Sequence, residues 1–398
     1  MSKIITDEKL IDKVLSRGVE DIVEKEHLKD ALLSGKQLRV KFGIDPTGSD
    51  LHLGHAVPLR KLKEFQDLGH KIVLIIGDFT AKIGDPTGRS KERVPLTDED
   101  VKSNMKNYLK QAGKIIDLKK TEINYNSKWF LKEGVKTIIE LSRAGSIQQV
   151  LRRADFKKRI SEGSDITLLE TLYPLFTGYD SVKVKADLEI GGNDQLFNVL
   201  MGRKVQRYYD IPEQDILTVP LLVGTDGVKK MSKSSNNYIS LSDKPFDILE
   251  EIMHMPDISL SEHAYSITND EVAEEWIKSF ESKENLRNKK LELAESVVAM
   301  YYPENDVRKA REEYEKRSEG RGPTDVAGYT FSKEKFSLPE LLLESRLVSS
   351  KSEGRRLVEQ GGVSVDDAIH KDPKEIITFK GGEIVKVGKR RCVLVNII

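Results

Sequence analysis

Two histidines stand three residues apart in the segment His52-Leu53-Gly54-His55. The segment follows a turn-rich stretch and opens a run with helical periodicity, so this spacing places both imidazoles on one face of a first helical turn. The unpaired N–H groups and the positive dipole end of a helix N-terminus favour phosphate oxygens, and Gly54 lets a nucleotide approach the backbone. The pattern indicates a phosphate site, although two ordinary surface histidines near a helix start would give the same four letters.

A second candidate is the pentapeptide Lys230-Met231-Ser232-Lys233-Ser234, in a polar loop after an apolar run. Two lysines among small residues can close over a triphosphate as mobile point charges. The alternative is a solvated basic loop. A specified pentapeptide is much rarer by chance than a four-residue motif, and its presence together with the histidine pair favours a nucleotide site.

The elements that must position these residues follow from the apolar pattern. Leu38–Ile44 predicts a buried strand, the turn-rich residues 45–50 a loop, Leu53–Leu68 a helix, and Lys71–Gly77 a second buried strand. A strand, a loop, a helix and a strand within such a short distance form the βαβ unit of an open parallel sheet. Later strands are predicted at Leu188–Ile190 and Ile216–Val223. His52 therefore follows the loop that leaves the carboxyl end of the Leu38–Ile44 strand.

The remaining segments suggest further domains. The N-terminal residues through Val19, Ile22, Val23, Leu28 and Leu32 have helical spacing that stops at Gly35, and residues 243–318 are almost wholly helical in pattern. The charged, Gly- and Pro-containing stretch from Arg317 to Tyr329 suits a linker. A new unit begins at Phe336, with two short helices and then strands at Val363–Val365, Glu383–Val387 and Cys392–Ile397.

We therefore predict an α/β chain of three domains. Residues 1–235 form a catalytic domain with a parallel sheet and N-terminal helices, residues 236–325 a helical domain, and residues 336–398 a small α+β domain.

Composition excludes only a few broad classes of protein. The 398 residues carry 65 Lys plus Arg and 65 Asp plus Glu, so net charge is uninformative about a nucleic-acid partner. One cysteine, Cys392, excludes an internal disulfide and suits a reducing cytoplasm. No apolar run is long enough to span a bilayer, and the N-terminus is unlike a secretory signal or a transit peptide. We expect a cytoplasmic protein without a membrane partner.

The two motifs in this order resemble the signatures of class I aminoacyl-tRNA synthetases. Further segments are similar, in order and spacing, to the tyrosyl-tRNA synthetases, and the resemblance runs from about residue 20 to the C-terminus. These segments are Lys41–Thr47, Gly84–Arg89, Tyr173, Tyr179-Asp180 and Gly191–Gln195. The resemblance implies a Rossmann-like catalytic domain, a helical domain that recognises the anticodon region, a homodimer, and ligation of L-tyrosine to tRNA(Tyr) through a tyrosyl-adenylate.

Amino-acid activation needs no catalytic base, because a carboxylate attacks the α-phosphate of ATP. Catalysis consists of positioning and of stabilising the charge that develops on the phosphates. By resemblance, the phosphate-binding residues are Thr47, His52, His55, Lys230 and Lys233, with Arg89 and Arg93 as candidate helpers. Gly54, Gly192, Asp194 and the backbone near Leu222 and Val223 are assigned to the nucleoside. Mg²⁺ would accompany ATP, and no metal site built from protein residues is expected.

The resemblance also assigns the amino-acid pocket. Asp180 would accept the phenolic O–H, and phenylalanine would leave that buried carboxylate unpaired; the family is itself the standard example of such hydroxyl discrimination. Tyr173 and Asp85 match contacts to the ammonium group, and Gln195 matches the carboxylate side. The chain departs from the family pattern at two positions: Thr177 replaces a glutamine, and Lys41 replaces a tyrosine that shares the phenol in some members. Taken alone, Asp180 could be a helix cap and Tyr173 a core residue.

The C-terminal tail resembles a small RNA-binding domain shared by a ribosomal protein and pseudouridine synthases. Its basic and acidic residues nearly balance, so RNA binding depends on where the basic residues stand. The candidates are Lys351, Arg355 and Arg356 at a helix start and Lys389, Arg390 and Arg391 in a turn. Without the rest of the chain, a solvated helix face would explain them equally well.

Three rival functions remain. A tryptophan-type synthetase shares the fold, but Tyr179-Asp180 and the Asp45-Pro46-Thr47 pattern oppose it. A small-molecule nucleotidylyltransferase also uses paired histidines, but the pentapeptide and the tail oppose it. A catalytically inactive RNA-binding relative is disfavoured by the two intact motifs. Phosphate-loop NTPases are excluded, because Gly84–Ser90 lacks their spacing and their lysine.

Overall fold

The computed structural model describes residues 3–48, 50–87, 96–318, 328–348, 350–366, 368–388 and 391–398. It divides into two compact units, Met1–Val307 and Arg308–Ile398. Among the described residues, no helix combines the length and the apolar character needed to cross a membrane.

The first unit is built on a six-stranded sheet in the order β1-β6-β5-β2-β3-β4. The strands are β1 (Asp21–Val23), β2 (Arg39–Ile44), β3 (Lys71–Ile76), β4 (Glu122–Tyr125), β5 (Leu188–Gly192) and β6 (Asp215–Val219). All neighbours are parallel except β1, which pairs antiparallel with β6. The predicted α/β fold class with a parallel sheet is confirmed.

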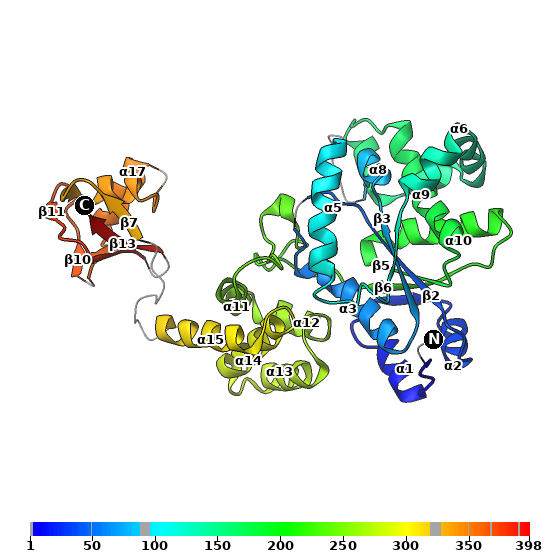
Figure 1. Cartoon of the computed structure of the whole chain (residues 1–398), viewed down its shortest axis with the longest axis horizontal. Coiled ribbons are helices and arrows are strands. Elements are labelled where there is room, and N and C mark those ends of the chain that lie inside the picture. The colour runs from blue at the N-terminus through cyan, green and yellow to red at the C-terminus, as the bar shows by residue number, and fades with distance from the viewer. Residues whose placement is uncertain are drawn as a thin grey trace. The chain divides into compact units, whose positions relative to one another are not determined.

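Helices cover both faces of this sheet (Figure 1). Successive residues of a strand point to opposite faces. Leu74 of β3 therefore packs with Leu59 and Ala112 on one side, while Val73 and Ile75 pack with Phe176 on the other. The first face is covered by α3 (Leu53–Asp67) and α5 (Asp98–Ala112), and the second by α6 (Ser127–Ala144), α9 (Leu168–Val184) and α10 (Leu196–Tyr208). Short helices α4 (Thr80–Ile83), α7 (Ile147–Val150) and α8 (Ala154–Ser161) connect these elements.

Two local predictions are corrected by the structure. The N-terminal segment forms α1 (Glu8–Val14) and α2 (Lys25–Leu33), but Asp21–Val23 between them is the edge strand β1. Its β-branched Ile22 and Val23 pair with Leu217 and Ile216 of β6, so sheet pairing overrides the helical spacing. The strand predicted to continue to Val223 ends at Val219, because Pro220 has no N–H to donate to a neighbour.

The helical pattern after residue 243 is confirmed. It forms α11 (Pro245–His254), α12 (Asp257–Ile267), α13 (Asp270–Ser282), α14 (Leu286–Ala299) and α15 (Glu304–Ser318). The boundary between the two units falls within α15, and the predicted linker lies mostly in residues 319–327, outside the described part. The division into three domains stays a prediction.

The second unit has its own sheet and core. Its five-stranded sheet has the order β10-β9-β12-β13-β7, and β11 pairs separately with β8. The elements are β7 (Gly328–Phe331), β8 (Lys335–Ser337), α16 (Leu338–Glu344), α17 (Lys351–Glu359), β9 (Val363–Val365), β10 (Ala368–His370), β11 (Ile376–Thr378), β12 (Ile384–Val387) and β13 (Arg391–Ile397). The two predicted helices and three predicted strands are present, with buried side chains such as Phe336, Leu341 and Val385 between them.

Candidate active site

The sheet fixes the place of the site. From β2 the chain proceeds to β3 and β4 on one side, and β5 and β6 lie on the other, so the strand order reverses between β2 and β5. Loops leaving the carboxyl ends of two such strands diverge and open a crevice, which is where open α/β sheets bind ligands. A cavity of about 530 Å³ lies there.

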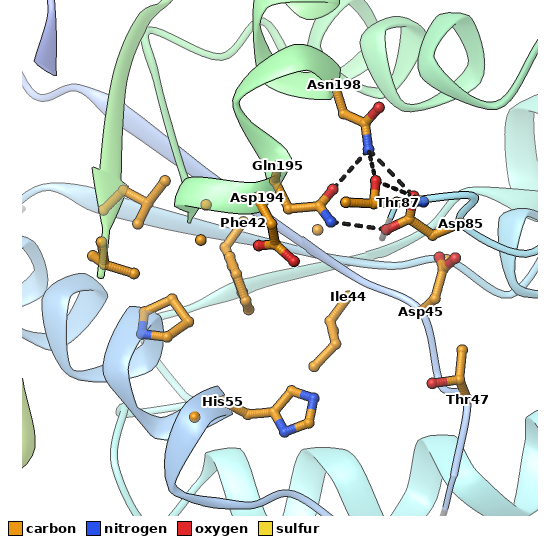
Figure 2. A pocket seen from close by; sticks show the side chains of 18 of the residues that line it. Phe42, Ile44, Asp45, Thr47, His55, Asp85, Thr87, Asp194, Gln195 and Asn198 are labelled. Carbon is orange, nitrogen blue, oxygen red and sulfur yellow. Dashed lines mark hydrogen bonds between the residues drawn. The ribbon is translucent and has the colours of Figure 1, made fainter. Parts of the chain in front are cut away.

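Most of the predicted site residues line this one cavity. They are Lys41, Thr47, His52, Gly54, His55, Asp85, Tyr173, Thr177, Asp180, Gly192, Asp194, Gln195, Leu222, Lys230 and Lys233. Segments almost 200 residues apart in the sequence therefore contribute to a single site, as the motifs predict. In Figure 2, His55 lies on one side of the cavity, and Gln195 and Asn198 lie on the other.

The two histidines open helix α3. His52 is its N-cap, and the backbone N–H of His52 donates to Nδ1 of His55 at 3.3 Å. The ring centroids are 3.9 Å apart. Because Nδ1 of His55 accepts a hydrogen bond, its Nε2 carries the proton and remains a donor.

Burial, with the nearby Lys233 and Lys230 charges, lowers the pKa of His52 to about 3. Burial, then His52 and the same lysines, also holds the pKa of His55 well below its ordinary value. Both rings are therefore neutral hydrogen-bond donors at physiological pH.

The loop that carries the two lysines is anchored at its centre. Met231 is buried, and its backbone N–H donates to Leu222 C=O at 2.8 Å. On either side, Lys230 forms an ion pair with Asp194, and Lys233 lies close to Gly48, where a Cβ would be 2.7 Å from Nζ. Burial lowers the pKa of Lys233, and the negative charge of Asp50 partly offsets this lowering. Two ammonium groups thus reach the cavity from one fixed point.

A hydrogen-bonded group of side chains forms the opposite wall (Figure 2). Gln195 Nε2 donates to Asp85 Oδ2 at 2.8 Å, and Thr87 Oγ1 donates to Asp85 Oδ1 at 2.6 Å. Asn198 Nδ2 donates to Gln195 Oε1 at 2.7 Å. Arg153 supports the group from behind, donating to Asn198 Oδ1 at 2.8 Å and to Thr87 Oγ1 at 2.9 Å. The wall presents a carboxylate and an amide with fixed orientations.

Tyr173 connects this wall to the end of β2. Its hydroxyl donates to Asp45 Oδ2 at 3.0 Å, and Thr80 Oγ1 donates to Asp45 Oδ1 at 2.7 Å. Burial, followed by Asp45 and Asp85, raises the pKa of Tyr173 well above its ordinary value. The ring is therefore a neutral wall of the pocket.

Asp180 lines the cavity and is 3% exposed. Its carboxylate accepts from Trp129 Nε1 at 3.0 Å and from Asn126 Nδ2 at 3.2 Å. Burial raises the pKa of Asp180 to about 7, against the lowering effect of Lys41 and of these two donors. A buried carboxylate whose pKa is about 7 suits the recognition of a single hydroxyl group.

Lys41 and Thr177, the two departures from the family pattern, also line the cavity. Lys41 is buried and donates to three protein oxygens, including Thr177 C=O. The Thr177 hydroxyl donates within its own helix, to Pro174 C=O at 3.1 Å.

The structure leaves several predicted residues elsewhere. Val223 is not among the residues that line the cavity and pairs with Lys230 in an antiparallel bridge. Arg89 and Arg93 lie outside the described residues. In the second unit, Lys351, Arg355 and Arg356 are exposed on α17. Lys389 and Arg390 lie outside the described residues, as does the side chain of Arg391, whose backbone begins β13.

The motifs did not single out several residues that the site uses. Asp45 belongs to a segment already noted, and its position directly after a buried strand was a usable signal. Asn126, Trp129 and Arg153 are joined to the site by hydrogen bonds between distant segments, and Thr80 and Asn198 line the cavity itself. Nothing in their local sequence indicates those contacts.

Comparisons with known proteins agree with this geometry. The family model described as tRNA synthetases class I (W and Y) matches residues 33–317, and the S4 domain model matches residues 337–385. The tyrosine–tRNA ligase of Burkholderia mallei is 42% identical over 385 residues, which is 95% of this chain and 93% of that protein. The tyrosine–tRNA ligase of Thermotoga maritima is 43% identical over 385 residues, 95% of each chain.

Solved structures share the fold. A mitochondrial tyrosyl-tRNA synthetase from Aspergillus nidulans superposes with a TM-score of 0.65 at 19% identity, over 78% of this chain and 93% of that one. The tyrosyl-tRNA synthetase of Archaeoglobus fulgidus, complexed with L-tyrosine, has a TM-score of 0.62 at 21% identity, over 77% of this chain and 100% of that one. With the family models and the bacterial relatives, the conclusion is that this chain belongs to the tyrosine–tRNA ligases, class I aminoacyl-tRNA synthetases with a C-terminal S4 domain.

Proposed function

We propose that the cavity binds L-tyrosine and ATP together, forms tyrosyl-adenylate and pyrophosphate, and then transfers the tyrosyl group to tRNA(Tyr) with release of AMP. The observation that carries this proposal is the continuity of the cavity. The buried carboxylate of Asp180 lines the same cavity as His52, His55 and the two lysines. An amino acid with a distal hydroxyl group and a triphosphate would meet within it.

In the first step, a carboxylate oxygen of tyrosine attacks the α-phosphorus as the bond to the pyrophosphate oxygen breaks. No proton is removed, so the residues position the reactants and stabilise charge. His52 and His55 donate hydrogen bonds from neutral rings, Thr47 offers a hydroxyl, and Lys230 and Lys233 add positive charge. Arg89 and Arg93 remain candidate helpers by resemblance alone.

ATP is the proposed nucleotide, with Mg²⁺ arriving as part of that substrate. Among the described residues, no group of three or more His, Cys, Asp or Glu side chains is arranged to hold a metal. Gly192 leaves space beside Asp194, because a Cβ there would lie 2.7 Å from Asp194 Oδ1. We propose that Asp194 accepts the ribose hydroxyls, while Gly54 and the Leu222–Val223 backbone border the nucleoside. Lys230 must then release Asp194 when ATP binds.

The amino acid is proposed to lie with its phenol at Asp180 and its ammonium near Asp85 and Tyr173. Gln195, fixed by Asp85 and Asn198, faces the carboxylate side. This arrangement places each charged part of tyrosine opposite a group of suitable polarity.

Transfer RNA is proposed to contact the C-terminal unit and the helices α11–α15. The exposed Lys351, Arg355 and Arg356 on α17 support the first contact, because a basic helix face attracts a phosphate backbone. Residues 1–235, 236–325 and 336–398 would then be the catalytic, anticodon-region and RNA-binding domains. We expect the aminoacylation reaction to take place in the cytoplasm.

A homodimer is the proposed assembly. Leu131, Val135 and Ile139 of α6 are exposed, and Val135 and Ile139, which follow the non-helical Gly134, are one turn apart on the same face. An apolar stripe of this kind on a charged chain suits burial against a second copy.

Pyrophosphate exchange into ATP, measured with each of the twenty amino acids, tests the proposed reaction. Tyrosine should support rapid exchange and the others very little. Exchange driven best by tryptophan, or by no amino acid, would overturn the proposal.

A further inference from the structure

A buried polar cluster lies at the wall of the pocket, where β2 and β5 run side by side. Lys41 and Glu189 are directly opposed in the parallel pair, and they are only 1% and 6% exposed. Ser181 of α9 and Gln214, just before β6, complete the group, and both are fully buried. We call these four residues the Lys41 cluster.

The Lys41 ammonium uses all its donors within the protein. Nζ donates to Thr177 C=O at 2.9 Å, to Ser181 Oγ at 2.8 Å and to Glu189 Oε1 at 2.8 Å. An ammonium group has three N–H bonds, so none remains for a ligand. Although Lys41 lines the cavity, it cannot donate to a phenol without losing one of these bonds.

The second oxygen of Glu189 is equally occupied. Ser181 Oγ donates to Oε2 at 3.1 Å, and Gln214 Nε2 donates to the same atom. Helix α10 covers the cluster at Gly202, where a Cβ would lie 2.5 Å from Gln214 Nε2 and 3.1 Å from Glu189 Oε2. Only a residue without a side chain lets α10 approach this closely.

The buried Lys41–Glu189 ion pair is not explained by a contribution to the stability of the fold. Removing two charges from water carries a desolvation cost, and well-packed apolar residues of similar volume often stabilise a fold as well or better. What the cluster adds is a fixed geometry. Its two contacts on α9, Thr177 and Ser181, are one turn apart and flank Asp180 between them.

We propose that Lys41 is a specificity-determining positioning residue: it clamps the turn of α9 on either side of Asp180 and so fixes the carboxylate that reads the substrate hydroxyl. Lys41 itself does not bind the phenol. This inference rests on the proposed activation of tyrosine and adds a role for residues that touch no substrate. The ammonium also supplies a positive charge close to the buried Asp180 carboxylate.

Three variants test the clamp. Lys41→Met removes the charge and its donors with similar length. Ser181→Ala keeps the ammonium but removes one of its tethers. Lys61→Met is the matched control, because Lys61 is another buried lysine that donates to main-chain oxygens, those of Val14 and Arg17, and does not line the cavity. Each variant is assayed by pyrophosphate exchange with tyrosine and with phenylalanine, and its melting temperature is recorded.

The clamp predicts that Lys41→Met lowers the ratio of kcat/KM for tyrosine over phenylalanine on the order of tenfold. Ser181→Ala should lower this ratio by about threefold. In both, KM for tyrosine rises while KM for ATP stays constant. Lys61→Met should lower the melting temperature and leave the ratio unchanged.

Two results would overturn the inference. An unchanged ratio in folded Lys41→Met would show that the cluster does not position Asp180. A loss in Lys41→Met with none in Ser181→Ala would show that Lys41 acts through its charge on Asp180 or by binding the phenol, and not by clamping α9. If Lys41→Met does not fold, the Ser181→Ala ratio decides alone. Absence of tyrosine-dependent exchange in the unmodified protein would instead contradict the proposed function.

Discussion

At the scale of single residues, the site works through groups whose protonation is set by burial. His52 and His55 are kept neutral, while Asp180 has a pKa of about 7 and can change charge near physiological pH. The motifs located these residues in the sequence. Their protonation could not be predicted, because it depends on neighbours such as Trp129 and Asn126 that come from other segments.

The pKa of Asp180 predicts a pH-dependent preference for tyrosine. Above pH 7 the carboxylate is ionised and accepts the phenol, whereas phenylalanine brings no hydroxyl group to add to the Trp129 and Asn126 donors. The kcat/KM ratio of tyrosine over phenylalanine should therefore rise between pH 6 and pH 8, by about tenfold at most for one ionisation. Lys41 and Asp45 are charged groups that act on Asp180, the first lowering its pKa and the second raising it. Asp180→Asn should give a flat, low ratio; a wild-type ratio independent of pH would contradict the assignment.

Lys233 should serve the transition state more than substrate binding, since its charge reaches the cavity from a loop. We expect Lys233→Ala to slow adenylate formation on the order of 100-fold. KM for tyrosine should stay nearly constant. Single-turnover kinetics check this, with the exposed Lys229→Ala, which does not line the cavity, as the matched control. A large loss of tyrosine affinity at a normal rate would show that the loop has another role.

At the scale of elements, the apolar pattern of the sequence predicted the strands that are buried in the core of the sheet. Strand β3 is a continuous apolar run after Lys71, and β2 and β5 are apolar apart from charged residues such as Lys41 and Glu189. All three strands appear within two residues of the predicted bounds. Strand β1 could not be predicted, because three residues at a sheet edge owe their conformation to β6. The close crossing of α9 and α10 was equally hidden: Gly178 and Gly202 are ordinary helix residues in the sequence, yet a Cβ at either would collide with the facing side.

That crossing gives a stability prediction. Gly202→Ala places a methyl group against Gln214, Glu189 and Ser181, none of which can move away without breaking a hydrogen bond. We expect the free energy of unfolding to fall by about 1–3 kcal/mol. Urea denaturation measures it. The exposed Leu200→Ala on the same helix should change it by less than about 0.5 kcal/mol. Equal stability of Gly202→Ala and the wild type would show that α10 can shift without cost.

At the scale of the whole molecule, the residues proposed for activation and those proposed for RNA binding lie in different units. Every described residue assigned to activation belongs to the first unit, and the basic helix α17 belongs to the second, which has its own core. The change of pattern at Phe336 and the resemblance of the tail indicated this division from the sequence alone. The position of each basic side chain in the second unit could not be predicted, because it depends on how α17 packs against α16 at Gly354.

Removing the second unit should separate the two steps. A chain shortened after Ser318 keeps the sheet and helices α11–α15, so it should retain tyrosine-dependent pyrophosphate exchange. Its tRNA charging should fall through weaker binding. With fewer lysines and arginines on the phosphates, the slope of log affinity against log salt should also flatten, by about 0.7–0.9 for each phosphate no longer neutralised. Filter binding across a salt series measures this slope. Equal slopes for both chains would show that the second unit does not contact RNA. Loss of exchange would show that the second unit supports the catalytic fold.

The central claim is that this cavity joins tyrosine to ATP, and mass spectrometry of the enzyme-bound product tests it most directly. The protein is mixed with ATP, Mg²⁺ and all twenty amino acids at equal concentration, in parallel with a Lys230→Ala/Lys233→Ala variant. The account predicts that tyrosyl-adenylate is the dominant adduct on the wild-type protein and is nearly absent from the variant. Tryptophanyl-adenylate as the main product, or no adenylate on a folded wild-type chain, would contradict it.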